Sequence, residues 1–110
     1  MKASNLVILS HQINTDFFKQ YLNGLNFDLF LVIYVCYLHQ PVGLGKLCKF
    51  TYLLTKVYDI NKKFVRARLF DYIDIDEYEV CRVTGEGLRL CLLYEEFVDS
   101  FVEAKPYLFK

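Results

Sequence analysis

A chain of 110 residues, of which 55% are hydrophobic and 17% aromatic, is long enough to form one domain with a substantial core. Its 13 bases and 13 acids cancel, which argues against a nonspecific polycation for nucleic acids. The N-terminus has no signal-peptide core, and the apolar run 29–38 is only about half the roughly 20 residues that a membrane span needs. We therefore expect a single cytoplasmic domain over residues 1–110, in the host cytoplasm if the chain is viral, with neither a membrane nor a small-molecule substrate as its partner.

The first 25 residues read as an N-terminal extension with a short helix over 16–22. A second helix is expected over 27–39, with Asn26 as its cap. This segment is apolar on nearly every side, which indicates a central buried helix or one that also contributes to a dimer interface. Its β-branched residues would also suit a strand, but its length and cap favour a helix.

Two further helices are expected in a basic part of the chain. Pro41 ends the preceding helix, the next runs from Leu44 into 52–56, and Asp59 is a plausible cap for another over 60–70. Between Pro41 and Phe70 the sequence has seven bases and one acid, a balance of +6, so the remainder carries −6. Such a change of sign suggests a face that meets a polyanion, although most charge runs are solvated helix faces.

The period of the apolar pattern then changes to two. The segments 72–75 and 78–83 alternate and predict a β-hairpin, and 71–79 contains five acids and no base. Thr84 is a plausible cap for a last helix that ends before Pro106. The fold class expected is therefore mainly α with a small β-hairpin (α+β).

The last helix has an apolar face wider than a small core needs. We therefore expect 84–105 to be a dimerisation helix that forms a homodimer. The interface residues expected on it are Leu90, Leu93, Phe97 and Phe101.

The four cysteines are not arranged as a zinc site. None stands in a C-x-x-C pair, and the chain has only two histidines, so no metal is expected. They are best read as small buried apolar residues, with Cys36 and Cys91 inside helices. The alternative is one or two disulfides, which in a cytoplasmic protein would indicate a hyperthermophilic archaeal setting. Because the common catalytic and cofactor motifs are also absent, we expect no enzyme and no cofactor.

Three short motifs resemble those of winged helix-turn-helix DNA-binding proteins of archaea and archaeal viruses. Segment 41–48, PVGLGKLC, resembles the P-[VI]-G-x-x-x-L-[AC] entry into their second helix. Segment 64–69, FVRARL, resembles the T-V-R-x-x-L core of their recognition helix. Segment 83–90, VTGEGLRL, resembles the L-T-E-x-G-x-x-L junction between the wing and the last helix. Two departures are a longer separation between Leu47 and Val65 and a short, acidic wing.

The resemblance implies a winged helix-turn-helix over 27–83, with an extra N-terminal helix and a long C-terminal helix. It implies a homodimeric, sequence-specific transcription regulator that binds double-stranded DNA. An acidic wing would repel phosphates, which leaves the helix at 60–70 as the reader of the major groove. The DNA-binding residues expected are Lys46, Lys49, Asn61, Lys62, Lys63, Arg66 and Arg68.

A second interpretation keeps the winged helix without the DNA. Such a domain can be a protein–protein interaction module, and the neutral total charge, the acidic hairpin and the apolar last helix favour that alternative. The operator sequence, any effector and the choice between activation and repression do not follow from the sequence.

Overall fold

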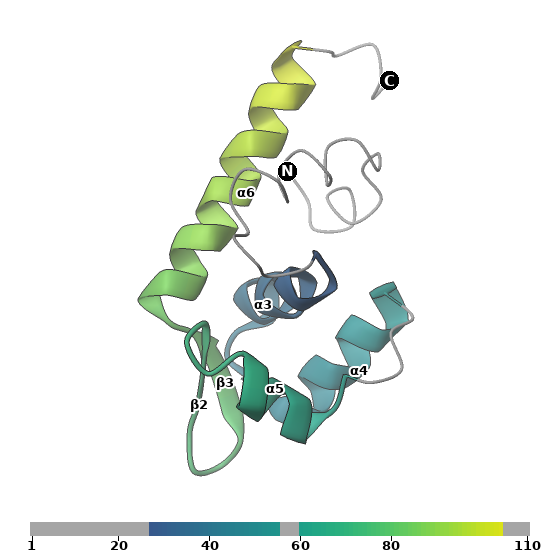
Figure 1. Cartoon of the computed structure of the whole chain (residues 1–110), viewed down its shortest axis with the longest axis vertical. Helices are drawn as coiled ribbons and strands as arrows, with labels where there is room; N and C mark the ends of the chain where they lie inside the picture. Colours follow the sequence, from purple (N-terminus) through teal and green to yellow (C-terminus); the bar gives the residue numbers. More distant parts are fainter. Residues whose placement is uncertain (1–26, 56–59, 105–110) are drawn as a thin grey trace.

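The computed structural model describes residues 27–55 and 60–104. At 27–28, 54–55 and 101–104 it describes the backbone but not the side chains. It is mainly helical with one small antiparallel sheet (Figure 1). The α+β class predicted from the sequence is therefore confirmed, whereas the predicted helix at 16–22 lies outside the described residues. The elements in chain order are α3 (Phe27–His39), β1 (Val42–Gly43), α4 (Leu44–Thr55), α5 (Lys62–Arg68), β2 (Ile73–Ile75), β3 (Val80–Val83) and α6 (Gly85–Ala104).

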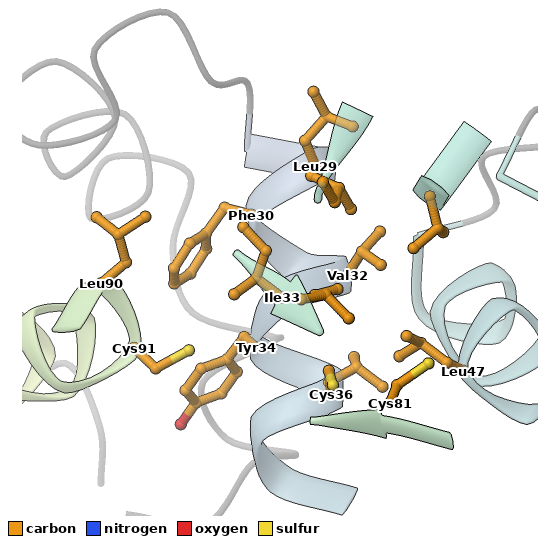
Figure 2. Packing of buried hydrophobic residues seen from close by; sticks show 14 of the residues in the cluster. Leu29, Phe30, Val32, Ile33, Tyr34, Cys36, Leu47, Cys81, Leu90 and Cys91 are labelled. Carbon is orange, nitrogen blue, oxygen red and sulfur yellow. The ribbon is translucent and has the colours of Figure 1, made fainter. Parts of the chain in front are cut away.

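Helix α3 is the centre of the structure, with the predicted bounds and the predicted burial. Every side chain from Leu29 to Cys36 is buried, because α3 packs against α4, β3 and α6 on its different sides. Figure 2 shows Phe30 and Tyr34 directed toward α6, and Cys36 near Leu47 of α4 and Cys81 of β3. Burying one such large apolar side chain contributes about 1.5–3 kcal/mol, which outweighs the modest helix propensity of the β-branched residues in α3.

Aromatic rings join α3 to α6. The Tyr94 ring of α6 stacks on Phe30, with ring centroids 5.0 Å apart, and on Tyr34, at 5.5 Å. Burial raises the pKa of Tyr34, and its hydroxyl has no hydrogen-bond partner within the described part of the chain. Because hydroxyl burial without a partner is costly, Tyr34 stabilises this interface through the packing of its ring and not through its hydroxyl.

The sheet has the strand order β1-β3-β2 and is antiparallel throughout. Strands β2 and β3 form the predicted hairpin, with Asp74 opposite Arg82. The two-residue strand β1 was not predicted, because so short a segment has no readable period; Val42 pairs with Cys81 in register. This third strand fixes the start of α4 beside the hairpin.

The hairpin strands are shorter than predicted because the turn between them takes more residues. The Asp76 carboxylate accepts the backbone N–H groups of Tyr78 at 2.8 Å and Val80 at 2.9 Å. Glu79 takes a positive φ of 61°, a conformation that is uncommon for a residue other than glycine. The turn therefore includes Asp76, and it also includes Tyr78 and Glu79, which were predicted to lie in the second strand of the hairpin.

Helix α5 begins and ends inside its predicted bounds of 60–70. The predicted cap, Asp59, was wrong: Asn61 caps the helix, and its Oδ1 accepts the backbone N–H of Phe64 at 3.0 Å. At the other end Leu69 leaves helical geometry and turns its side chain into the core. Asn61 provides the better cap because its β-region backbone directs its side-chain oxygen at the unpaired N–H groups of the first turn.

Helix α6 begins at Gly85 and is capped, as predicted, by Thr84. The Thr84 hydroxyl accepts the Gly87 N–H at 3.1 Å and donates to the Asp71 carbonyl at 2.7 Å. A Cβ at Gly87 would lie 2.2 Å from the Tyr72 carbonyl oxygen, so this position has room for glycine alone. No helix among residues 27–55 and 60–104 is long and apolar enough to cross a membrane.

Candidate nucleic-acid interface

Helices α4 and α5 carry six bases and no acid. They pack against each other on the same side of α3 (Figure 1). All six of these side chains are exposed, so they can meet a ligand without any rearrangement of the core; they are Lys46, Lys49, Lys62, Lys63, Arg66 and Arg68. We call this the α4–α5 surface.

Helix α5 is short and strongly two-sided. Val65 is fully buried, and the Phe64 ring is half-buried against the core. At about 100° per residue, Arg66 and Lys63 lie about 100° and about 160° around the helix from Val65, on the outward face, whereas Lys62 lies about 60° from Val65, at the edge of that face. Ala67 lies on that face as well and is exposed, so a flat ligand can approach the backbone of α5 closely there.

Arg68 lies apart from the other cations of α5. Its guanidinium lies over the Phe64 ring, 5.5 Å from the ring centroid, one turn away. This cation–π contact is worth about 0.5–1 kcal/mol at an exposed site. Arg68 therefore flanks the outward face, and its position is fixed by an aromatic ring rather than by an acid.

Glu79 joins the hairpin to α5. Its carboxylate accepts hydrogen bonds from Lys62 Nζ at 2.8 Å and from Arg66 Nη2 at 3.0 Å. These two bonds lower the pKa of Glu79 below its usual value. In the sequence, Glu79 is one of the five acids of a hairpin expected to repel phosphates. In the structure it pairs with Lys62 and Arg66, two of the residues predicted to contact DNA.

Lys62 also lies beside the start of α4. A Cβ built at Gly45 would be 3.8 Å from Lys62 Cε, which is ordinary contact distance. The end of the Lys62 side chain therefore lies near Gly45 in the first turn of α4, the helix that carries Lys46 and Lys49. Asn61, the seventh predicted contact, is exposed, but its side-chain oxygen is used as the cap of α5.

Two exposed aromatic residues near these elements were not singled out by the sequence analysis. Phe70, which follows α5, is 66% exposed, and Tyr78 at the hairpin turn is 79% exposed. The sequence placed both at the end of a predicted element, the helix 60–70 and the strand 78–83, whereas in the structure both lie just outside α5 and β3. Glu79 was missed for another reason: its partners lie 13 and 17 residues away in the sequence.

The residues predicted for a dimer interface are distributed differently from the prediction. Leu90 is 3% exposed and belongs to the core of the chain itself, so almost none of its surface is left for a second subunit. Leu93 and Phe97 are half-buried against the same core, and the Phe101 side chain lies outside the described residues. The exposed leucines of α6 are Leu88 and Leu92, one turn apart.

All four cysteines are free thiols, and Cys36 and Cys91 are buried inside helices as predicted. Burial raises the pKa of Cys36 to about 12 and that of Cys81 to about 11. Both thiols are therefore protonated at neutral pH and poorly nucleophilic. Within the described ranges, no three histidine, cysteine or acidic side chains come together as a metal site.

We compared the chain with known protein families, curated proteins and solved structures. Neither a protein-family model, nor a curated protein, nor a solved structure gives a significant match to this chain.

Proposed function

We propose that this protein is a winged helix-turn-helix transcription regulator that binds specific double-stranded DNA sequences as a homodimer, with α5 in the major groove. The observation that carries the proposal is the α4–α5 surface: six exposed bases on two helices without an acid of their own. The element order supports it, because three helices, a hairpin and a further helix succeed one another as in winged-helix domains.

The geometry of α5 suits such a role. In helix-turn-helix proteins the second helix of the pair enters the major groove, and the first crosses the phosphate backbone. Arg66 and Lys62 are exposed and lie one helical turn apart on α5, and an Arg in the major groove can bond the O6 and N7 atoms of guanine. Lys46 and Lys49 on α4 would then contact phosphates, which adds affinity without sequence preference.

The experiment is a titration of DNA with paired variants. A duplex selected from a random pool by the purified protein is titrated with wild type and with the double variant Lys62→Ala, Arg66→Ala. Each lost contact should cost about 1–3 kcal/mol of binding free energy. Arg89→Ala is the matched control, because Arg89 is an exposed Arg paired with Glu86 on α6. If the double variant binds the duplex as well as wild type does, α5 is not the reader.

The homodimer is proposed through the outer face of α6. The contacts proposed on this face are Leu88, which is 38% exposed, and Leu92, which is 49% exposed. Leu92→Asp should give monomers and a large loss of affinity for a palindromic duplex, because a hot-spot side chain contributes on the order of 2 kcal/mol or more. Phe101→Asp should act in the same way. Wild-type protein that is monomeric in light scattering at micromolar concentration would contradict the dimer.

A protein–protein interaction module is the second candidate. It is favoured by the ion pairs of Glu79, which already occupy two of the six bases, and by the exposed leucines of α6. The two functions separate on one measurement. DNA binding must weaken steeply as salt rises, whereas an adaptor would show no salt-dependent retention of duplex DNA at all.

A further inference from the structure

The position of the Glu79 carboxylate is set by the fold. The Glu79 N–H donates to the Asp76 carbonyl at 3.0 Å, and the Glu79 carbonyl accepts the N–H of Leu44, the first residue of α4, at 2.8 Å. With its backbone at a φ of 61°, the side chain extends from the hairpin toward α5. It meets Lys62 and Arg66, which stand one helical turn apart.

These contacts change what the two cations offer to DNA. Lys62 and Arg66 together carry +2, and Glu79 reduces the charge of the group to +1. The side chains of Lys62, Arg66 and Glu79 remain 54%, 49% and 39% exposed, so a ligand can reach all of them. Any phosphate that approaches must compete with a carboxylate at hydrogen-bond distance, which weakens attraction based on charge alone.

The pairing leaves directional donors on Arg66. A guanidinium has five N–H donors in a fixed plane, and among the described residues the hydrogen bond found for the Arg66 guanidinium uses Nη2 to Glu79. The remaining donors stay available, and the same bond restricts the orientations that they can take. An Arg that is fixed in this way is better suited to a pair of base acceptors than to a phosphate of variable position.

We propose that Glu79 is a specificity-determining residue of the α4–α5 surface: it fixes Lys62 and Arg66 and reduces their attraction for phosphate, so that base contacts rather than charge select the DNA. This inference rests on the proposed function. It gives the acidic hairpin a positive role in discriminating one duplex from another.

The test compares Glu79→Gln with wild type on two duplexes of equal length, the selected one and a random one, over a range of salt concentrations. Glu79→Gln should bind the random duplex at least several-fold more tightly. The slope of log affinity against log salt should steepen by about 1, as expected for one more neutralised phosphate. The ratio of selected to random affinity should therefore fall.

Glu77→Gln is the matched control, because it removes the same charge from the same hairpin. Glu77 is exposed and takes part in none of the ion pairs found in the described part of the chain. If both variants raise random-duplex affinity by the same factor, or if Glu79→Gln weakens binding to both duplexes, the inference is overturned.

Folding and function are checked separately. Circular dichroism establishes that Glu79→Gln is folded. If it is not, Glu79→Asp takes its place with a smaller expected effect, because Asp tolerates a positive φ and is one methylene too short to reach both cations. Wild type that binds neither duplex overturns the proposed function and this inference together. Wild type that binds, with Glu79→Gln equal to Glu77→Gln, overturns the role of Glu79 alone.

Discussion

Helix α3 and helix α5 use their side chains in opposite ways. In α3 eight consecutive side chains, from Leu29 to Cys36, are buried, so nearly every position contributes to the core. In α5 Val65 alone is fully buried, and the cations point outward. The difference separates two kinds of experiment: changes in α3 should alter the stability of the protein, whereas changes on the outer face of α5 should alter what it binds.

The largest expected effect is on stability, from the centre of α3. Phe30→Ala should lower the free energy of unfolding by about 3–5 kcal/mol, because the ring is completely buried and stacks on Tyr94. Phe70→Ala removes the same group at a site that is 66% exposed and should change stability by less than about 0.5 kcal/mol. Urea unfolding followed by circular dichroism measures both, and equal losses would mean that the two regions do not differ as described.

A smaller effect of opposite sign is expected at Tyr34. Its hydroxyl is buried with no hydrogen-bond partner among the described residues, and leaving such a group unpaired costs about 1–3 kcal/mol. Tyr34→Phe keeps the ring stacking and removes the hydroxyl, so it should raise the midpoint of urea unfolding. A lower midpoint for Tyr34→Phe would show that the hydroxyl is bonded in solution.

How well the sequence predicted each helix follows from the same comparison. The bounds of α3 were predicted correctly because a run of apolar residues that ends before a proline is a local signal; the predicted cap, Asn26, lies outside the described residues. The cap of α5 was misassigned because Asn61 and Asp59 are both good caps, and the choice depends on where Val65 and Leu69 meet the core. Strand β1 and the Glu79 ion pairs could not be predicted, because they join residues that are distant in the sequence.

The candidate site was predicted in part for a related reason. A cluster of bases is visible in the sequence, and all six of the predicted Lys and Arg residues are exposed. The position of an opposing acid is not visible, because it depends on the turn that Asp76 organises and on the positive φ of Glu79. For α6, the sequence showed how many apolar residues the helix has but not which of them, such as Leu90, the core of the chain buries.

The smallest expected effect is a pH dependence of the stability that the ion pairs between Glu79 and α5 contribute. Hydrogen bonds from Lys62 and Arg66 hold the pKa of Glu79 below its usual value of 4.5. The ion pairs therefore stabilise the folded state fully above about pH 4.5, and this contribution is lost as the pH falls from that value through the lower pKa of the folded state. Because all three side chains of these ion pairs are partly exposed to solvent, the contribution should be small and should weaken further in salt.

The pKa of Glu79 can be followed directly. In a carbon-detected NMR titration, its carboxyl group should titrate below the usual range in wild type. In Lys62→Ala, Arg66→Ala the pKa should move back up toward the usual value. An unchanged pKa in the double variant would show that the two ion pairs are not formed in solution.

The central claim is that the α4–α5 surface contacts DNA while α3 and α6 support it. NMR mapping of backbone amide shifts, on addition of a short duplex at low salt, tests this most directly. We predict shifts concentrated at Lys46, Lys49 and residues 61–68, with the buried amides of α3 unchanged. Shifts confined to the outer face of α6 around Leu88 and Leu92, or no shifts at any duplex concentration, would contradict the account.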